Sequence, residues 1–129
     1  MKIRKCLSYD DVLLAPQYSD IKSRSEVLIG SALDDDLLFD LPIISSPMDT
    51  LTESSMASAM NTAGGLGIIH RYNSIEDQAA IVMAEELADA RTIAAAIGIS
   101  GDYFERATEL AKAGVSIFCL DVAHGHHIM

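Results

Sequence analysis

Four short apolar runs in this sequence are each followed by residues that could hold a small ligand. Hydroxyl, imidazole, guanidinium and carboxylate groups supply most polar contacts in such sites. The residues that follow the four runs are Ser45, Ser46, Met48 and Asp49, then His70 and Arg71, then Ser100 and Gly101, and finally Asp121, His124, Gly125, His126 and His127. Turn residues at strand ends explain part of this pattern. His70, Arg71 and Asp121 come directly after apolar runs. This position favours a binding role for Asp121, whereas Arg71 fits a binding role and a structural role equally well.

Two other kinds of site are weighed and set aside. The histidines from His124 to His127 suggest a metal site, but only Asp121 adds a ligand at suitable spacing, so we predict a loop and no metal. The acidic run 34–36 is interpreted as a solvated loop. The glycines in 64–67 resemble a dinucleotide loop, but they precede an apolar run instead of following one.

Neither cysteine has the surroundings of an activated nucleophile. Cys119 lies inside an apolar run and is expected to be a buried, unreactive thiol. Cys6 lies near the N-terminus with no histidine or helix start beside it. Two cysteines are also too few for a disulfide scaffold. We therefore assign no catalytic residue within this chain.

Apolar runs alternate with helical patterns from residue 41 onward. Predicted strands cover 41–46, 66–70, 92–99 and 115–121, and predicted helices cover 54–62, 75–90 and 103–113. Ser74 with Asp77, and Asp102 with Glu105, have the spacing of helix caps. Continuous apolar strands alternating with helices are typical of an α/β fold with a parallel sheet. Ligands bind such sheets at the carboxyl ends of the strands, where the residues named above lie.

Composition and charge narrow the class of protein. The chain has 129 residues, is 50% hydrophobic and carries 9 Lys+Arg against 19 Asp+Glu, for a net charge of −10. That charge argues against nucleic-acid and membrane partners held by a basic surface, although helix N-termini could still bind phosphate. Residues 1–40 predict an irregular arm with one short hairpin, and residues 41–129 predict the α/β part. The sequence has no signal peptide and no apolar run of about 18 residues, so we expect a cytoplasmic protein.

Four segments, taken in order, resemble motifs of the IMP dehydrogenase and GMP reductase family. Residues 7–16 read LSYDDVLLAP, 45–53 read SSPMDTLTE, 64–71 read GGLGIIHR and 121–126 read DVAHGH. The resemblance implies the first half of a (β/α)8 TIM barrel, in a family that usually assembles as a tetramer. It also implies a catalytic cysteine, expected beyond Met129, that attacks purine C2.

The same resemblance implies roles for six residues. Contact with IMP or GMP is implied for Ser46, Met48 and Arg71, and a place on the cofactor side is implied for Asp121, His124 and Gly125. The family either oxidises IMP to XMP with NAD or converts GMP to IMP and ammonia with NADPH. The segments SSPMDT and GGLG favour the first reaction. The absence of a regulatory insertion after helix 75–90, together with the His70-Arg71 pair and Val122-Ala123 after the aspartate, favours the second.

A non-catalytic function is a separate hypothesis. Four parallel strands that do not close leave the first and last strands unpaired, with apolar side chains uncovered. Such a half-barrel could bind a second copy of itself, or a separate chain that completes the barrel.

Overall fold

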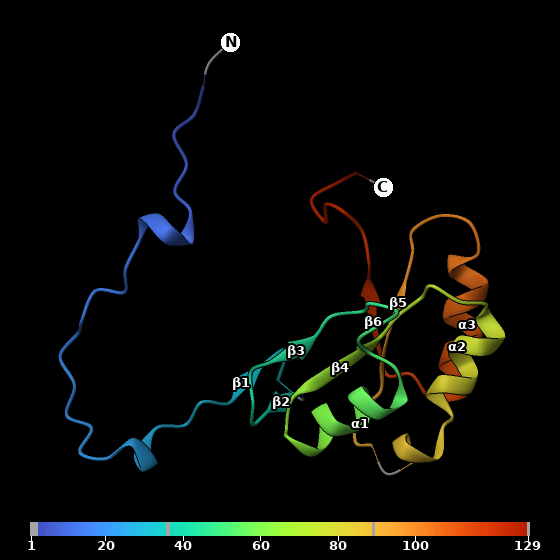
Figure 1. Ribbon diagram of the computed structural model, residues 1–129, viewed down its shortest axis with the longest axis horizontal. Coiled ribbons are helices and arrows are strands. Elements are labelled where there is room, and N and C mark those ends of the chain that lie inside the picture. The colour runs from blue at the N-terminus through green and yellow to red at the C-terminus, as the bar shows by residue number, and fades with distance from the viewer. Residues whose placement is uncertain (1–2, 36, 89, 129) are drawn as a thin grey trace.

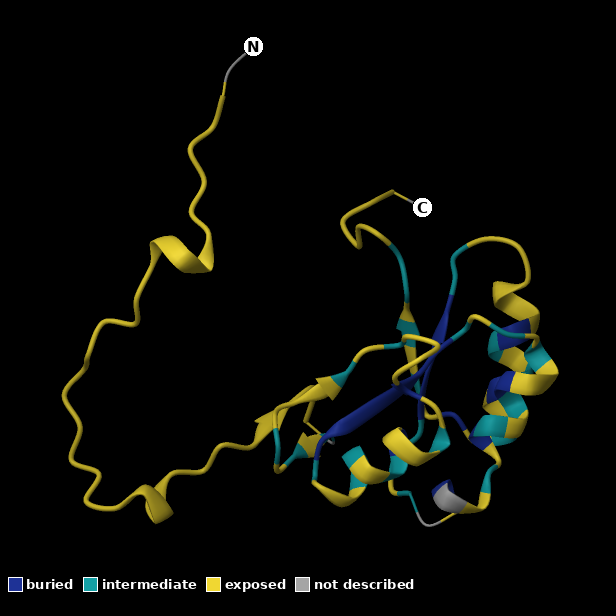
Figure 2. Ribbon diagram, in the orientation of Figure 1, coloured by how far each residue is buried: buried dark blue, intermediate teal, exposed yellow. Residues whose placement is uncertain are grey.

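The computed structural model describes residues 3–35, 37–88 and 90–128, with an extended N-terminal arm leading into an α/β body (Figure 1). Every residue from 3 to 35 is exposed (Figure 2). The arm contains two short 3-10 helices, η1 (Tyr9–Asp11) and η2 (Arg24–Glu26). Side chains of the preceding serines support both: Ser8 exchanges hydrogen bonds with Asp11, and the Ser23 hydroxyl accepts one from the Ser25 amide. These hydrogen bonds are local, and residues 3–35 contribute no buried side chain to a core.

The predicted hairpin is confirmed at the junction of the arm and the body. β1 (Ser31–Ala32) pairs antiparallel with β2 (Leu38–Phe39). In the connecting turn the Leu37 amide donates to the Asp34 carboxylate at 2.8 Å. Asp34 and Asp35 of the acidic run are both exposed, and Asp36 lies outside the described residues.

The body confirms the predicted α/β class, with strands and helices alternating along the chain. Its parallel strands are β3 (Ile44–Ser45), β4 (Leu66–Ile69), β5 (Ala94–Ile97) and β6 (Ile117–Leu120), and its helices are α1 (Ser54–Thr62), α2 (Ile75–Val82) and α3 (Tyr103–Ala113). The strands lie side by side in chain order, β3-β4-β5-β6. This is the arrangement of half a barrel, and among the described residues the sheet stays open. None of the described helices combines the length and apolar character that a membrane span requires.

Two local predictions are wrong in detail. The helix predicted over 75–90 ends at Val82, where Ala84 takes an extended backbone (φ −61°, ψ 147°) before the short 3-10 helix η3 (Glu85–Leu87). The chain turns there because Leu87, only 2% exposed, enters the core. Asp102 precedes α3 but makes no side-chain cap, because its carboxylate binds Arg106 instead.

Each face of the sheet has its own apolar cluster. On the face covered by helices, Ile69, Ala95 and Ile97 pack with residues such as Leu110. On the other face, Leu66, Ile68, Ala94 and Ala96 form a second cluster with Phe39 and Ile117 alongside. β4 and β5 are buried on both faces (Figure 2). The two central strands of the sheet are therefore covered on both faces.

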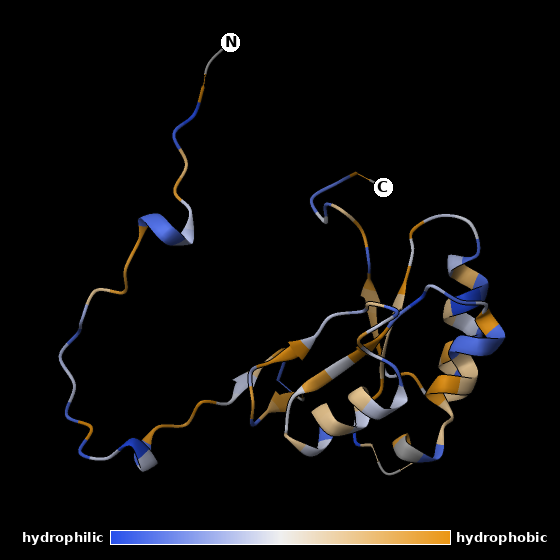
Figure 3. Ribbon diagram, in the orientation of Figure 1, coloured by the Kyte–Doolittle hydropathy of each residue, from blue (hydrophilic) through white to orange (hydrophobic). Residues whose placement is uncertain are grey.

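On the outer strands, where the sequence predicts uncovered apolar groups, several apolar side chains are exposed. Ile43 and Ile44 at β3 are 53% and 47% exposed, and Phe118 and Leu120 on β6 are 37% and 60% exposed. Figure 3 shows the hydrophobic character of β3, together with apolar stretches along the arm. Phe118 and Leu120 pair with Ala95 and Ile97 of β5, which belong to the cluster packed against the helices. Paired residues point to the same side of a sheet, so Phe118 and Leu120 face the side of the helices.

Candidate functional site

An ion pair joins the carboxyl ends of β4 and β6. Arg71 follows β4, and its Nε donates to Asp121 Oδ2 at 3.1 Å, while its Nη2 donates to the Asp121 backbone carbonyl at 3.2 Å. Asp121 directly follows β6, fifty residues further along the chain. A Cβ added to Gly98, just past β5, would stand 3.5 Å from Arg71 Nη1. The Arg71 side chain therefore crosses the end of β5, and three neighbouring strands contribute to one site.

The pair is partly open to solvent. The side chains of Arg71 and Asp121 are 35% and 26% exposed. The Arg71 guanidinium carbon also lies 5.7 Å from the centre of the Tyr72 ring, within the range of a cation–π contact. Within the described part of the chain, Asp121 Oδ1 accepts no hydrogen bond. This oxygen can accept hydrogen bonds from the hydroxyl groups of a ligand.

His70, which precedes Arg71, is a buried anchor. It is 3% exposed, and its Nδ1 accepts a hydrogen bond from the Tyr72 amide at 3.2 Å. A neutral imidazole then carries its proton on Nε2, and this nitrogen lies 3.4 Å from Glu53 Oε1. The His70 amide also donates to the Thr52 carbonyl at 3.3 Å. His70 thus ties the end of β4 to the loop before α1.

The loop after β3 carries Ser46 and Met48, two predicted substrate contacts. Thr52, fully buried, donates from Oγ1 to the Ser46 carbonyl at 2.6 Å and lies 3.0 Å from Ser45 Oγ. The side chains of Ser46 and Met48 stay exposed. The structure therefore places them at the same end of the sheet as Arg71. Among the described residues no hydrogen bond joins them to the ion pair.

His124 and Gly125 lie in the exposed segment after β6. The rings of His124 and His126 are 6.2 Å apart in an edge-on arrangement. The described residues contain no group of three or more potential metal ligands. Of the six predicted site residues, Arg71 and Asp121 are brought together from different strands by side-chain contact. Ser46 and Met48 are joined within their own loop, where the Met48 amide donates to the Ser46 carbonyl at 2.9 Å.

Cys119 is half-buried in β6, less deeply than the sequence predicts. Burial raises the pKa of its thiol above the usual value, and the nearby Asp121 charge adds to the effect. The thiolate is the reactive form, so this shift lowers its reactivity at neutral pH. Cys6 is exposed in the arm.

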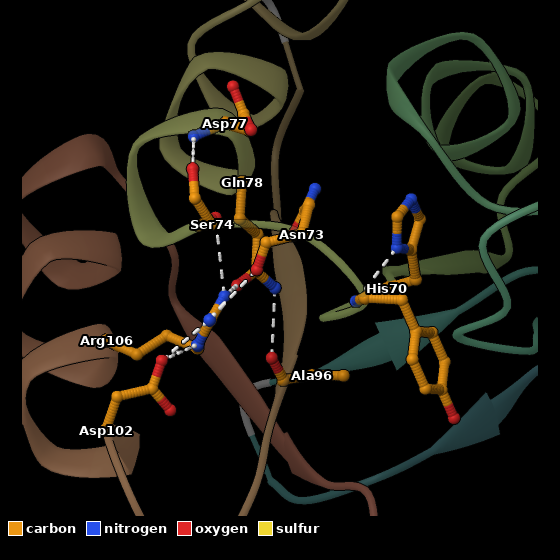
Figure 4. Close-up of polar contacts among 9 residues, drawn as sticks. His70, Asn73, Ser74, Asp77, Gln78, Ala96, Asp102 and Arg106 are labelled. Atoms are coloured by element: carbon orange, nitrogen blue, oxygen red, sulfur yellow. Dashed lines mark hydrogen bonds and ion pairs between the residues drawn. The ribbon is translucent and has the colours of Figure 1, made fainter.

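Sequence reasoning missed a buried polar network behind the site. Arg106 on α3 and Gln78 on α2 are 7% and 0% exposed (Figure 4). Arg106 donates to Gln78, to Asp102 and to the Asn73 carbonyl of the β4–α2 loop, and Gln78 donates to the Ala96 carbonyl. One signal was present in the sequence. Arg106 stands in the helical stripe that also holds Leu110 and Ala113, where an apolar residue is expected.

Comparison with known proteins places the chain in a family. Residues 6–129 match the IMP dehydrogenase / GMP reductase domain. The chain is 44% identical over 102 residues to an inosine-5'-monophosphate dehydrogenase of Nitrosopumilus maritimus, covering 79% of this chain and 21% of that protein. It is 46% identical over 76 residues to a GMP reductase of Leishmania donovani, covering 59% and 15%.

A third relative aligns with almost the whole chain. An inosine-5'-monophosphate dehydrogenase of Cryptosporidium parvum is 32% identical over 168 residues, covering 98% of this chain and 41% of that protein. The chain therefore spans less than half the length of each of these relatives. Because the domain match runs from residue 6 to the C-terminus, the chain belongs to the IMP dehydrogenase / GMP reductase family, whose names denote oxidoreductases.

Proposed function

We propose that this chain supplies the N-terminal half of a purine-nucleotide oxidoreductase that oxidises IMP to XMP with NAD. The observation that carries the proposal is the contact of Arg71 with Asp121 across the carboxyl ends of β4, β5 and β6. Parallel α/β folds place their ligands at this end of the sheet. Conversion of GMP to IMP with NADPH is the second candidate, favoured by the similarity to the Leishmania donovani GMP reductase.

Asp121 would lie on the cofactor side, with His124 and Gly125 in the adjoining loop. A nicotinamide dinucleotide presents ribose hydroxyl groups, and the open Oδ1 of a half-buried carboxylate fits such donors. When bound, the nicotinamide supplies hydride transfer. The role of this chain is to orient the cofactor, since Arg71 holds the other carboxylate oxygen in place.

Ser46, Met48 and Arg71 would lie on the substrate side. The exposed Ser46 hydroxyl and Met48 side chain leave the loop after β3 open to a nucleotide. Thr52 fixes the backbone of this loop through the Ser46 carbonyl, so these groups are held in place before a ligand arrives.

Chain 1–129 alone is expected to show no turnover of IMP with NAD or of GMP with NADPH. The proposed chemistry needs an activated thiolate at the purine. Burial raises the pKa of Cys119, and Cys6 lies on the exposed arm. Absorbance of the reduced nicotinamide at equimolar enzyme and substrate is the measurement. Turnover by the purified chain would contradict this assignment.

A positive test joins the chain to a catalytic segment. Residues 6–129 would replace the matched segment of the Nitrosopumilus maritimus enzyme, and a parallel chimera would use the Leishmania donovani enzyme. We expect the first chimera to oxidise IMP with NAD and to retain more of its parent's kcat/KM than the second. A folded first chimera that binds no IMP would overturn the proposal. A better-retained GMP reductase activity would select the second candidate.

Pairing with another half-barrel is a candidate function of a different class, favoured by the exposed apolar groups of β3 and β6. Light scattering of the chain in about 0.15 M salt, which screens its charge of −10, should give a mass above the 13.9 kDa monomer. Leu120→Ser changes an exposed side chain on the helix side of β6, and it should lower the measured mass toward that of the monomer. Met83→Ser, also exposed but at the end of α2, is the control and should not. A stable monomer at all concentrations would count against pairing.

A further inference from the structure

Arg106 is a buried cation in the contact between α3 and α2. Its side chain is 9% exposed, and both Nε and Nη2 bind Asp102 Oδ2, at 3.1 Å and 2.7 Å. Asp102 itself is 48% exposed, so only one partner of this pair is removed from water. Burying a charge is unfavourable unless hydrogen bonds compensate it. An apolar residue would pack beside Leu110 without that requirement, so packing alone does not explain an arginine here.

The rest of the guanidinium binds the β4–α2 loop and α2. Nη2 donates to the Asn73 carbonyl at 3.0 Å, and Nη1 donates to Gln78 Oε1 at 2.7 Å, with the Ser74 carbonyl 3.5 Å away (Figure 4). Together with Asp102, these groups give the guanidinium four acceptors, and the planar fork of arginine has enough N–H donors to serve them at once. A lysine ammonium has no such fork.

Gln78 carries the network into the sheet. It is fully buried on α2, and its Nε2 donates to the Ala96 carbonyl at 3.0 Å. The last registered pair of β4 and β5 is Ile69 with Ala95, so Ala96 lies just past the end of β4. The chain Arg106–Gln78–Ala96 thus joins α3, α2 and β5 at the end of the sheet that carries Arg71.

The loop from 70 to 74 is held on both sides of Arg71. His70 is fixed to Thr52 and Glu53 before it, and the carbonyls of Asn73 and Ser74 are fixed by Arg106 after it. The hydrogen bond from Arg106 lowers the pKa of Asp102, and the charge of Arg71 adds a smaller lowering.

We propose that Arg106 is a positioning residue that holds the β4–α2 loop so that the Arg71 guanidinium stays on Asp121. The Arg106 fork fixes two loop carbonyls within three residues of Arg71, and Gln78 fixes the fork to the sheet. The inference rests on the proposed function only in treating the Arg71–Asp121 pair as the ligand-binding end. The positioning itself is a property of chain 1–129.

Hydrogen exchange of the Arg71 Nε proton, followed by proton–nitrogen NMR of chain 1–129 without ligand, tests the proposal. The Arg71 Nε signal is identified by its loss in Arg71→Lys. Asp121→Ala removes the acceptor of this proton, so its exchange rate in that variant is the reference for a fully released Arg71. Arg106→Lys keeps the charge but loses the fork, and we expect it to raise this exchange rate about tenfold. Lys112→Met is the matched control, since Lys112 is an exposed cation on the same helix, and it should leave the rate unchanged.

The outcomes separate positioning from general loosening. An unchanged Arg71 rate in folded Arg106→Lys would overturn the proposal. So would an equal rise in the exchange of the Ala95 amide, which lies in the buried centre of β5. If Arg106→Lys does not fold, the same measurement is made on Asp102→Asn, because the Asp102 side chain is half-exposed and can be changed without opening the core. We expect the exchange rate of the Arg71 Nε proton to rise, by less than in Arg106→Lys, while the exchange rate of the Ala95 amide stays unchanged. Because no ligand is present, this result is independent of whether the chimeric enzymes oxidise IMP.

Discussion

Replacing Asp121 with alanine in the active Nitrosopumilus chimera should lower kcat/KM for NAD about 100-fold, the scale of loss when a reacting group is misplaced by about 1 Å. The substitution removes the acceptor of Arg71 Nε and the open oxygen proposed to bind the cofactor. Affinity for IMP, measured by titration of the chimera without NAD, should stay close to that of the parent chimera. Steady-state rates measured at varied NAD concentration give kcat/KM for NAD. A fall in this value with unchanged IMP affinity places the effect of Asp121 on the cofactor side.

A matched control and a second variant sharpen this prediction. Glu109→Ala removes a carboxylate from the exposed side of α3, where its partner among the described residues is Lys112, and should leave the rate unchanged. Arg71→Lys should weaken both substrate and cofactor use, because Arg71 is assigned to the nucleotide and also holds Asp121. Collapse of IMP affinity in Asp121→Ala would show that the aspartate serves the substrate instead.

Replacing Gly67 with alanine should destabilise the chain by about 3 kcal/mol, the upper end of the usual overpacking effect. A Cβ at this position would lie 2.5 Å from Ala57 Cα and 3.0 Å from Ala57 Cβ. The nearest atom belongs to the backbone of α1, so no side-chain rotation can relieve the clash and the helix must move off β4. Urea unfolding followed by circular dichroism is the measurement, and the melting temperature should fall by roughly 10 °C.

Gly125→Ala provides the control for this substitution. A Cβ at Gly125 meets no atom within 4 Å, so its unfolding free energy should stay within about 0.5 kcal/mol of the unchanged chain. If Gly67→Ala is equally silent, α1 does not lie on β4 as described. The same shift of α1 would move Thr52 and the loop after β3, so Gly67 links the stability of the chain to its candidate site.

The sequence alone was sufficient for the class of fold and the order of the elements, and it singled out two residues that the structure brings into contact. Four apolar runs and three helical patterns appear in the structure as β3 to β6 and α1 to α3. The predicted cap of α2 is present too, with the Asp77 amide donating to the Ser74 hydroxyl. These features depend on residues only a few positions apart in the chain. The spacing of apolar residues and the presence of capping residues are therefore enough to predict them. Arg71 and Asp121 were found by their place after apolar runs.

Only the tertiary structure decided which of these side chains meet. Arg71 contacts Asp121 because the strand order places β4 and β6 on either side of β5, and the Arg71 guanidinium passes beside Gly98. Asp102 has the sequence pattern of a helix cap, but Arg106 competes for its carboxylate, and α2 ends early because the core takes Leu87. Such outcomes are set by competition between distant groups for the same partner or the same space. Local sequence records which groups are available, and the packing of the sheet and helices determines which of them bind.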